Sequence, residues 1–227
     1  MGINLGNLAP EPTVDIKAEA AGVAPAAPVA EPVLPAGVEK VDRGGGVVSL
    51  NLSKGISLDL SKTMPTLDKL TVGLGWDTTA DLDVFALALH NGKVLSGNDV
   101  IFFNQKNAVA GINLMGDCRN GALSEGDDES IKMVLSQIPA DVDSVAIFVN
   151  IFQATNQNFG MVKGAYCRIV NDDTNKEEAI YILNESDAAL YNAFHFVTFK
   201  RNATGWSFET VAKGMNGDIN TIANQFC

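Results

Sequence analysis

The stretch Leu70-Thr71-Val72-Gly73-Leu74-Gly75-Trp76-Asp77 decides the fold, because large apolar residues alternate in it with small or polar ones. Successive side chains of a strand point to opposite faces, so this period of two predicts a strand with one buried face. The same alternation recurs at Leu50/Leu52, Ile56/Leu58/Leu60, Ile131/Met133/Leu135, Val145/Ile147/Val149/Ile151 and Phe194/Phe196/Thr198. Gly, Asn, Asp or Pro, which are typical of turns, bound each segment. We therefore expect many short, half-buried strands.

Turn residues between these segments indicate how the strands connect. Asn91-Gly92 is typical of a two-residue hairpin, and residues 171–177 and 202–205 resemble longer hairpin loops. Helix is expected only in short pieces, near residues 185–193 and 218–226, with Asp218 as the N-cap of the second. Many short strands with regular turns favour a sandwich or a barrel, so the chain is expected to be all-β.

The N-terminal part of the chain differs in composition from the rest. Six of the eight prolines precede residue 44, and the first aromatic residue is Trp76. A Pro/Ala-rich segment without aromatic residues buries too little apolar surface to offset its ordering entropy. We expect residues 1–44 to be an extended or disordered arm, with Gly44-Gly45-Gly46 as its hinge, and residues 45–227 to be the folded domain.

Charge and composition limit the classes of molecule that the protein is expected to bind and the compartment in which it is expected to occur. The net charge of −11 argues against binding to nucleic acid and to anionic membrane surfaces, both of which call for basic patches. No stretch approaches the roughly twenty apolar residues of a membrane-spanning helix. The first basic residue is Lys17, which argues against a secretory signal, and the three cysteines show no disulfide framework. A soluble protein of the reducing cytoplasm is expected.

Acidic residues gather in two segments. The first contains Asp77, Asp81 and Asp83; the second is the glycine-punctuated stretch of residues 116–129, with Asp117, Glu125, Asp127, Asp128 and Glu129. Residues two apart in a strand share a face, so Asp81 and Asp83 present both carboxylates to one side. Acidic turns are often only solvated. However, carboxylates this dense repel one another unless a cation lies among them, and we interpret the two segments as halves of one calcium site.

The kinds of ligand select the metal. Calcium takes six to eight oxygen ligands in irregular geometry, which suits carboxylates collected from loops. Zinc requires thiolates or imidazoles, and the two histidines and three cysteines show no paired spacing. Magnesium remains an alternative, although it prefers a regular octahedron. The pattern is not an EF-hand, because Asp81-Leu82-Asp83 lacks the third acidic position and the glycine of that loop.

Several short motifs follow one another along the chain: Leu50-Asn51-Leu52-Ser53-Lys54-Gly55-Ile56-Ser57-Leu58, Val72-Gly73-Leu74-Gly75-Trp76-Asp77, Asp81-Leu82-Asp83, Gly116-Asp117, Gly126-Asp127-Asp128-Glu129, Gln157-Asn158-Phe159-Gly160 and Gly205-Trp206-Ser207-Phe208. In this order they resemble the TerD family of tellurium-resistance and stress-response proteins. The resemblance covers about residues 47–227 and implies a two-sheet β-sandwich that binds calcium through acidic loops. It places Asp77, Asp81, Asp83, Asp117, Asp127, Asp128 and Glu129 on the family's acidic positions.

The function expected from these observations is binding rather than catalysis. The sequence contains no nucleophile elbow, phosphate-binding loop or dinucleotide fingerprint. The acidic charge also argues against holding an oxyanion such as tellurite. We expect a calcium-binding, non-enzymatic stress-response module that interacts with other proteins or with itself through residues 1–44 or a sheet edge. The alternative is a structural component of a virion or another large assembly, docked through the N-terminal arm.

Overall fold

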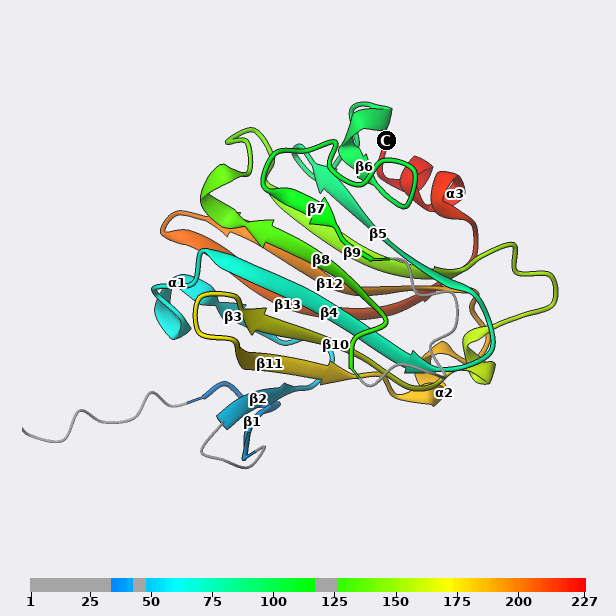
Figure 1. Cartoon of the computed structure of the whole chain (residues 1–227), viewed down its shortest axis with the longest axis horizontal. Helices are drawn as coiled ribbons and strands as arrows, with labels where there is room; N and C mark the ends of the chain where they lie inside the picture. The colour runs from blue at the N-terminus through cyan, green and yellow to red at the C-terminus, as the bar shows by residue number, and fades with distance from the viewer. Residues whose placement is uncertain (1–33, 43–47, 117–125) are drawn as a thin grey trace, which may run out of the picture. The chain divides into compact units, whose positions relative to one another are not determined.

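The computed structural model of the chain describes residues 34–42, 48–116 and 126–227 (Figure 1). These residues form two β-sheets. The first sheet has the strand order β1 (Val38–Asp42), β2 (Val48–Leu52), β11 (Lys176–Ile182), β10 (Lys163–Asn171), β4 (Lys69–Asp77), β8 (Glu129–Val134) and β7 (Ile112–Leu114). The second has the order β3 (Ser57–Asp59), β13 (Gly205–Met215), β12 (Ala193–Asn202), β9 (Ser144–Ile151), β5 (Leu82–Leu89) and β6 (Val100–Ile101).

All strand pairs within the sheets are antiparallel except β11 with β2. Helical structure in the described residues is limited to short pieces: α1 (Leu60–Thr63), α2 (Glu185–Ala188), α3 (Ile219–Ala223), η1 (Gly97–Asp99), η3 (Leu135–Gln137), η4 (Phe159–Met161) and η5 (Asn224–Phe226). None of these helices has the length and apolarity that crossing a bilayer demands. The expected all-β sandwich with a few short helices is confirmed.

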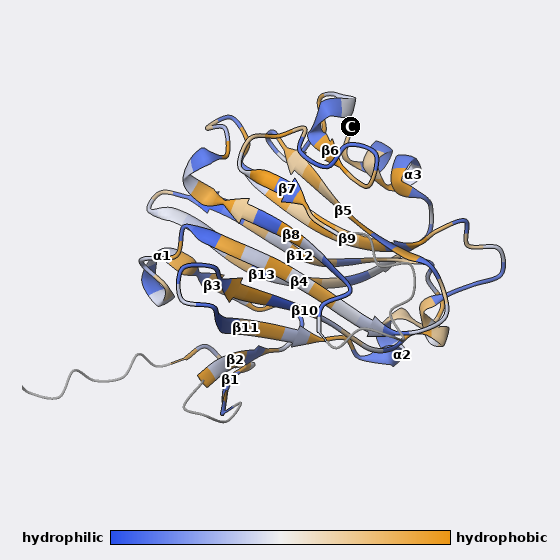
Figure 2. Ribbon diagram, in the orientation of Figure 1, coloured by the Kyte–Doolittle hydropathy of each residue, from blue (hydrophilic) through white to orange (hydrophobic). Residues whose placement is uncertain are grey.

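The main core lies between the two sheets. In β4 the residues Leu70, Val72, Leu74 and Trp76 all face it, as their spacing predicts, while Thr71 on the other face is partly exposed. Figure 2 shows the hydrophobic residues spread along the strands of both sheets, whereas the joining loops are largely hydrophilic. The apolar residues alternate in the sequence because every second side chain of these strands faces this core.

A second apolar layer covers the outer face of the second sheet. Phe148 in β9 stacks on Phe85 in β5 at 5.0 Å and meets Phe226 of η5 at 5.7 Å between ring centroids. The preceding helix α3 is held by Asp218, whose carboxylate accepts a hydrogen bond from the backbone N–H of Thr221 at 2.7 Å. Asp218 is thus the N-cap that its sequence context predicts. Because α3 and η5 cover this face, β5 and β9 are buried on both sides.

One strand lies where the sequence predicted an arm. Residues 38–42 fall inside the expected arm of residues 1–44, yet they form β1 and pair along β2, from Val38 opposite Leu52 to Asp42 opposite Val48. Backbone hydrogen bonds make this strand, and only Val38 at its start is buried, so composition was a poor guide to it. The triple glycine and residues 1–33, on which the docking-arm alternative depends, lie outside the described residues.

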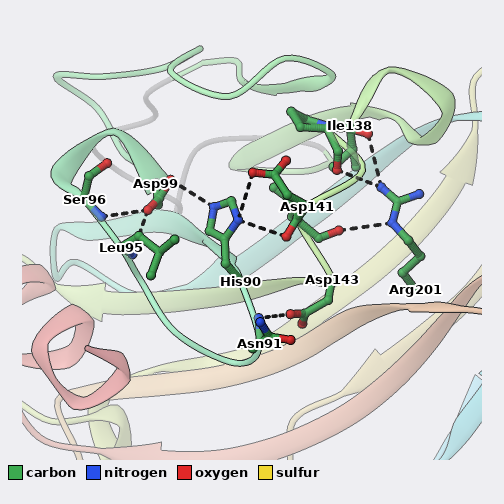
Figure 3. Close-up of polar contacts among 11 residues, drawn as sticks. His90, Asn91, Leu95, Ser96, Asp99, Ile138, Asp141, Asp143 and Arg201 are labelled. Carbon is green, nitrogen blue, oxygen red and sulfur yellow. Dashed lines mark hydrogen bonds and ion pairs between the residues drawn. The ribbon is translucent and has the colours of Figure 1, made fainter.

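The predicted hairpin at Asn91-Gly92 is present, and both residues have positive φ, 54° and 75°. His90, directly before the turn, ties three loops together (Figure 3). Its Nδ1 lies 2.9 Å from the carbonyl of Asp141, and its Nε2 lies 3.3 Å from Oδ1 of Asp99. These contacts give His90 a structural role at the end of β5 remote from Asp81 and Asp83.

His195 makes the stability of the fold sensitive to acid. Its ring stacks 4.2 Å from that of Phe148, and its Nε2 lies 2.8 Å from Oγ1 of Thr198. Burial lowers the pKa of His195 from 6.5 to about 4, and the positive charges of Lys213 and Lys200 act in the same direction. Between these two pH values His195 is mostly protonated in the unfolded chain and mostly neutral in the folded chain.

We therefore expect the free energy of unfolding to fall as the pH drops from about 6.5 to about 4, by about 2 kcal/mol at pH 5 from this group. Urea unfolding of the wild type and of His195→Gln, each at pH 7.5 and pH 5, checks the expectation. The variant should lose less stability between the two pH values. Equal losses in the two proteins would show that His195 does not carry the effect.

Candidate metal site

The two acidic segments lie at the same end of the sandwich. β4 pairs with β8 so that Leu74 lies opposite Glu129, which brings the residues after β4 beside those that precede β8. β5 of the second sheet begins at the same end (Figure 1). The Oε2 atom of Glu129 reaches across to it and accepts a hydrogen bond from the N–H of Val84 at 2.9 Å. The acids of the two segments are therefore neighbours in space.

Asp128 and Glu129 are buried carboxylates, only 6% and 4% exposed, and both satisfy strand backbone. On its outer edge β5 pairs with β6 only at Ala86 and Leu87, so the N–H of Val84 has no strand beside it there, and Glu129 supplies the acceptor. Asp128 accepts from the N–H of Trp76 at 2.7 Å, just beyond the last residue pair of β4 and β8. Both carboxylates thus stabilise strand ends.

Asp127 is engaged in an ion pair. Its two carboxylate oxygens accept from Nε and Nη2 of Arg168 at 2.7 and 3.0 Å, and Oδ1 also accepts from the hydroxyl of Tyr166 at 3.0 Å. The hydrogen bond to Asp127 raises the pKa of Arg168, and burial together with the Asp127 charge raises the pKa of Tyr166. A carboxylate held at both oxygens by a guanidinium is poorly placed to bind a metal.

The glycines of the Gly-Leu-Gly motif make room for this cluster on the outer face of the first sheet. A Cβ atom on Gly73 would lie 2.1 Å from Oδ2 of Asp127, and one on Gly75 would lie 2.4 Å from the ring of Tyr166. Arg168 and Tyr166 are the partners of these glycines across β10. The sequence offered Asp127 as a metal ligand; its partner Arg168 lies 41 residues away and follows only from the strand register.

The acids of the first segment occupy different surroundings. Asp77 ends β4 and is exposed, while Asp81 precedes β5, is partly buried, and accepts at its carbonyl from the N–H of Phe152 at 2.7 Å. Asp83 lies within β5 opposite Asn150 of β9 and is only 7% exposed. Along β5, Asp83 has the same parity as Phe85 and so lies on the outer face of the second sheet, whereas Glu129 points between the sheets.

These residues supply the right atoms for calcium but do not complete a site by themselves. Among residues 34–42, 48–116 and 126–227, no three Asp, Glu, His or Cys side chains converge into a group that could hold a metal ion. Asp117 and Glu125 lie outside the described residues. The buried acids at this end, Asp83, Asp128 and Glu129, carry hard carboxylate oxygens, the kind of ligand that calcium prefers, but they do not point to one common position. Cys167, by contrast, is buried in the main core, where burial raises the pKa of its thiol.

By its fold and its acidic end, the chain is a two-sheet β-sandwich protein with carboxylates at the ends of its strands. The sequence model of the TerD domain matches residues 48–226. The chain is similar to the tellurium resistance protein TerD of Alcaligenes sp. (41% identity over 189 residues, 79% of this chain and 97% of the relative). It is also similar to general stress protein 16U of Bacillus subtilis (38% over 190 residues, 79% and 97%).

Among solved structures, a homologue of the telluride resistance protein TerD from Streptomyces coelicolor A3(2) superposes with a TM-score of 0.55. The match covers 69% of this chain and 95% of that chain, at 21% identity, and it supports the fold. The chain belongs to the TerD family.

Proposed function

We propose that the chain is a calcium-binding stress-response protein of the tellurium-resistance type that acts by binding other proteins and not as an enzyme. Its relatives are named for tellurium resistance and for general stress. The observation that carries the calcium proposal is the meeting of two acidic segments, 45 residues apart, through the hydrogen bond from Val84 to Glu129. Asp128 and Glu129 are buried at that point, and carboxylate oxygens are the ligands that calcium prefers.

The ligands we propose are Asp81, Asp83, Asp128 and Glu129, joined by Asp117 and Glu125 from the intervening stretch. Asp77 would lie at the rim of the site. Asp127 would not bind the ion; its ion pair with Arg168 would hold the backbone just before Asp128 in place. A bound calcium ion would supply positive charge and tie together the ends of strands from both sheets. These residues contribute the negative oxygens that six- to eight-fold coordination requires.

Several observations support a binding role over catalysis. His195 is buried against Phe148, and His90 lies between Asp99 and Asp141, so both histidines are occupied in the structure. The strands β1 and β7 end the first sheet, and an edge strand offers backbone groups to which a partner strand can add. We propose that a protein partner, or a second copy of the chain, binds at such an edge in the cytoplasm, and that nucleic acids and membranes are not partners.

Thermal unfolding with and without calcium tests the metal part of the proposal. At a hundred times the dissociation constant, a ligand that binds only the folded state adds about 2.7 kcal/mol. For a domain of this size each kcal/mol raises the melting temperature by about 2–4 °C, so saturating calcium should raise it by about 5–10 °C over excess chelator. Identical midpoints would refute the proposed site.

Two variants localise the effect. Asp83→Asn keeps the shape of the side chain and removes its charge, and it should abolish most of the calcium-dependent rise. The matched control is Asp173→Asn, because Asp173 is 54% exposed and pairs with Lys69, the first residue of β4, at the opposite end of that strand. The control should melt like the wild type in both buffers. An equal calcium response in Asp83→Asn and the control would remove Asp83 from the site.

A further inference from the structure

A cavity of about 600 Å³ opens on the outer face of the second sheet. Its walls come from three places in the sequence: residues 97–105 around β6, residues 150–153 at the end of β9, and the first turn of α3. Figure 1 shows α3 near β6, the edge strand of this sheet. The volume falls within the range of about 300–1,000 Å³ that is typical of small-molecule sites.

Aromatic side chains form one wall of the cavity. The ring of Phe103 lies edge-on between those of Phe102 and Phe152, with centroids 5.3 and 6.0 Å away. Phe152 is 38% exposed although it belongs to this cluster, and it lines the cavity. Ile219 of α3 adds apolar surface to the lining. Edge-to-face rings of this kind leave faces and edges on which another flat ring packs well.

The lining also includes Asn150, whose side-chain amide is buried. Asn150 is only 3% exposed, and its Oδ1 atom accepts no hydrogen bond from any residue that the structure describes. Its Nδ2 atom is directed to the carbonyl of Ile151 at 3.4 Å, so Oδ1 is the atom of this amide that lacks a partner among the described residues. A buried carbonyl oxygen without a donor is unfavourable, so a ligand that brings an N–H to it gains affinity and specificity.

Two other polar residues of the lining, Gln105 and Asp218, have side chains that are engaged in hydrogen bonds. The side-chain amide of Gln105 donates to the carbonyls of Gly97 and Val100, both at 2.7 Å, and so braces the wall. Among the described residues that line the cavity, Asp218 is the one that carries a charge, and its carboxylate caps α3. The described part of the lining contains no lysine or arginine, and the chain carries a net charge of −11, so the site disfavours ligands that bear a phosphate or a carboxylate.

We propose that this cavity is a binding site for a small, uncharged, planar aromatic heterocycle, whose ring packs against Phe103 and Phe152 and whose N–H donates to Oδ1 of Asn150. The site is separate from the calcium ligands proposed above, although Asn150 is the cross-strand neighbour of Asp83. Ligand binding is therefore measured both in calcium and in chelator, so that a failure of the metal proposal and a failure of this one are told apart.

Indole is the probe, because it is flat, neutral and carries one N–H. Titration followed by two-dimensional NMR of the full chain should show saturable shifts of Asn150, Phe103 and Phe152 signals. 1-Methylindole lacks the donor and should bind at least tenfold more weakly, and indole-3-carboxylate should not bind measurably. Absence of saturable shifts with indole, or equal affinity for indole and 1-methylindole, would overturn the proposal.

Three variants locate the site. Asn220→Trp places a large ring at the rim, since Asn220 is exposed and lines the cavity, and it should abolish indole binding. Asn224→Trp makes the same change at an exposed residue outside the lining and should bind like the wild type. Asn150→Leu should bring indole and 1-methylindole to the same affinity, with folding checked by its thermal melt. Wild-type binding in Asn220→Trp would show that indole binds elsewhere.

Discussion

Replacing Phe148 with alanine is expected to cost about 3–5 kcal/mol of folding free energy, the usual range for a large aromatic residue in a packed core. Phe148 is fully buried and stacks on Phe85 on one side and on His195 on another. The apolar layer between the second sheet and η5 rests on this ring through Phe226. Its removal therefore leaves a cavity that three neighbours line but none can fill without moving.

Urea unfolding measures this loss, and Phe152→Ala is its control. Phe152 is also a phenylalanine and directly follows the last residue of β9, but it is 38% exposed and should lose less than half as much stability. Equal losses in Phe148→Ala and Phe152→Ala would mean that the layer under α3 and η5 does not support the sheet.

The change Gly73→Ala is expected to cost about 1–3 kcal/mol, because overpacking at a filled position forces neighbours to move. The added Cβ would overlap Oδ2 of Asp127, and that carboxylate is held in place by Arg168 and Tyr166. Relief of the overlap therefore breaks a charge-assisted pair of hydrogen bonds. Chemical unfolding of the variant gives the cost directly.

Two further proteins make the reason testable. Gly97→Ala is the matched control, since a Cβ there meets no atom within 4 Å and its stability should stay within about 0.5 kcal/mol of wild type. In an Asp127→Ala background the obstacle is gone, so Gly73→Ala should cost clearly less than it does in the wild type. A full cost in that background would show that Asp127 does not lie over Gly73.

The strands could be predicted because every second residue of a strand with one buried face points into the core and is apolar. Leu70 to Trp76 face one core and alternate, and the register of β4 follows from that face. In β9 the positions between the residues of the main core are also apolar, because Ala146 and Phe148 occupy them. Such a continuous apolar run is typical of a strand that is buried on both faces. The covering of this face by α3 and η5 was not predicted, since the contact joins residues some 78 positions apart.

The candidate site was less accessible to sequence reasoning. Dense acids indicate a cation, but not whether the cation is a metal or an arginine of the same chain, and Asp127 has Arg168. The choice depends on which residues a strand register places side by side, and a pattern within one segment does not contain it. β1 was assigned to the arm for a similar reason, because an edge strand is made by backbone pairing and needs little apolar surface.

The most direct measurement is the structure of the chain crystallised with calcium, with the ion located by its anomalous scattering. The account predicts an ion at the end of the sandwich where β4 ends and β5 and β8 begin, with carboxylate oxygens of both acidic segments, among them Asp83 and Asp128 or Glu129, within about 2.3–2.6 Å of it. Carboxylates that contact only backbone N–H groups and Arg168, with no ion at that end of the molecule, would contradict it.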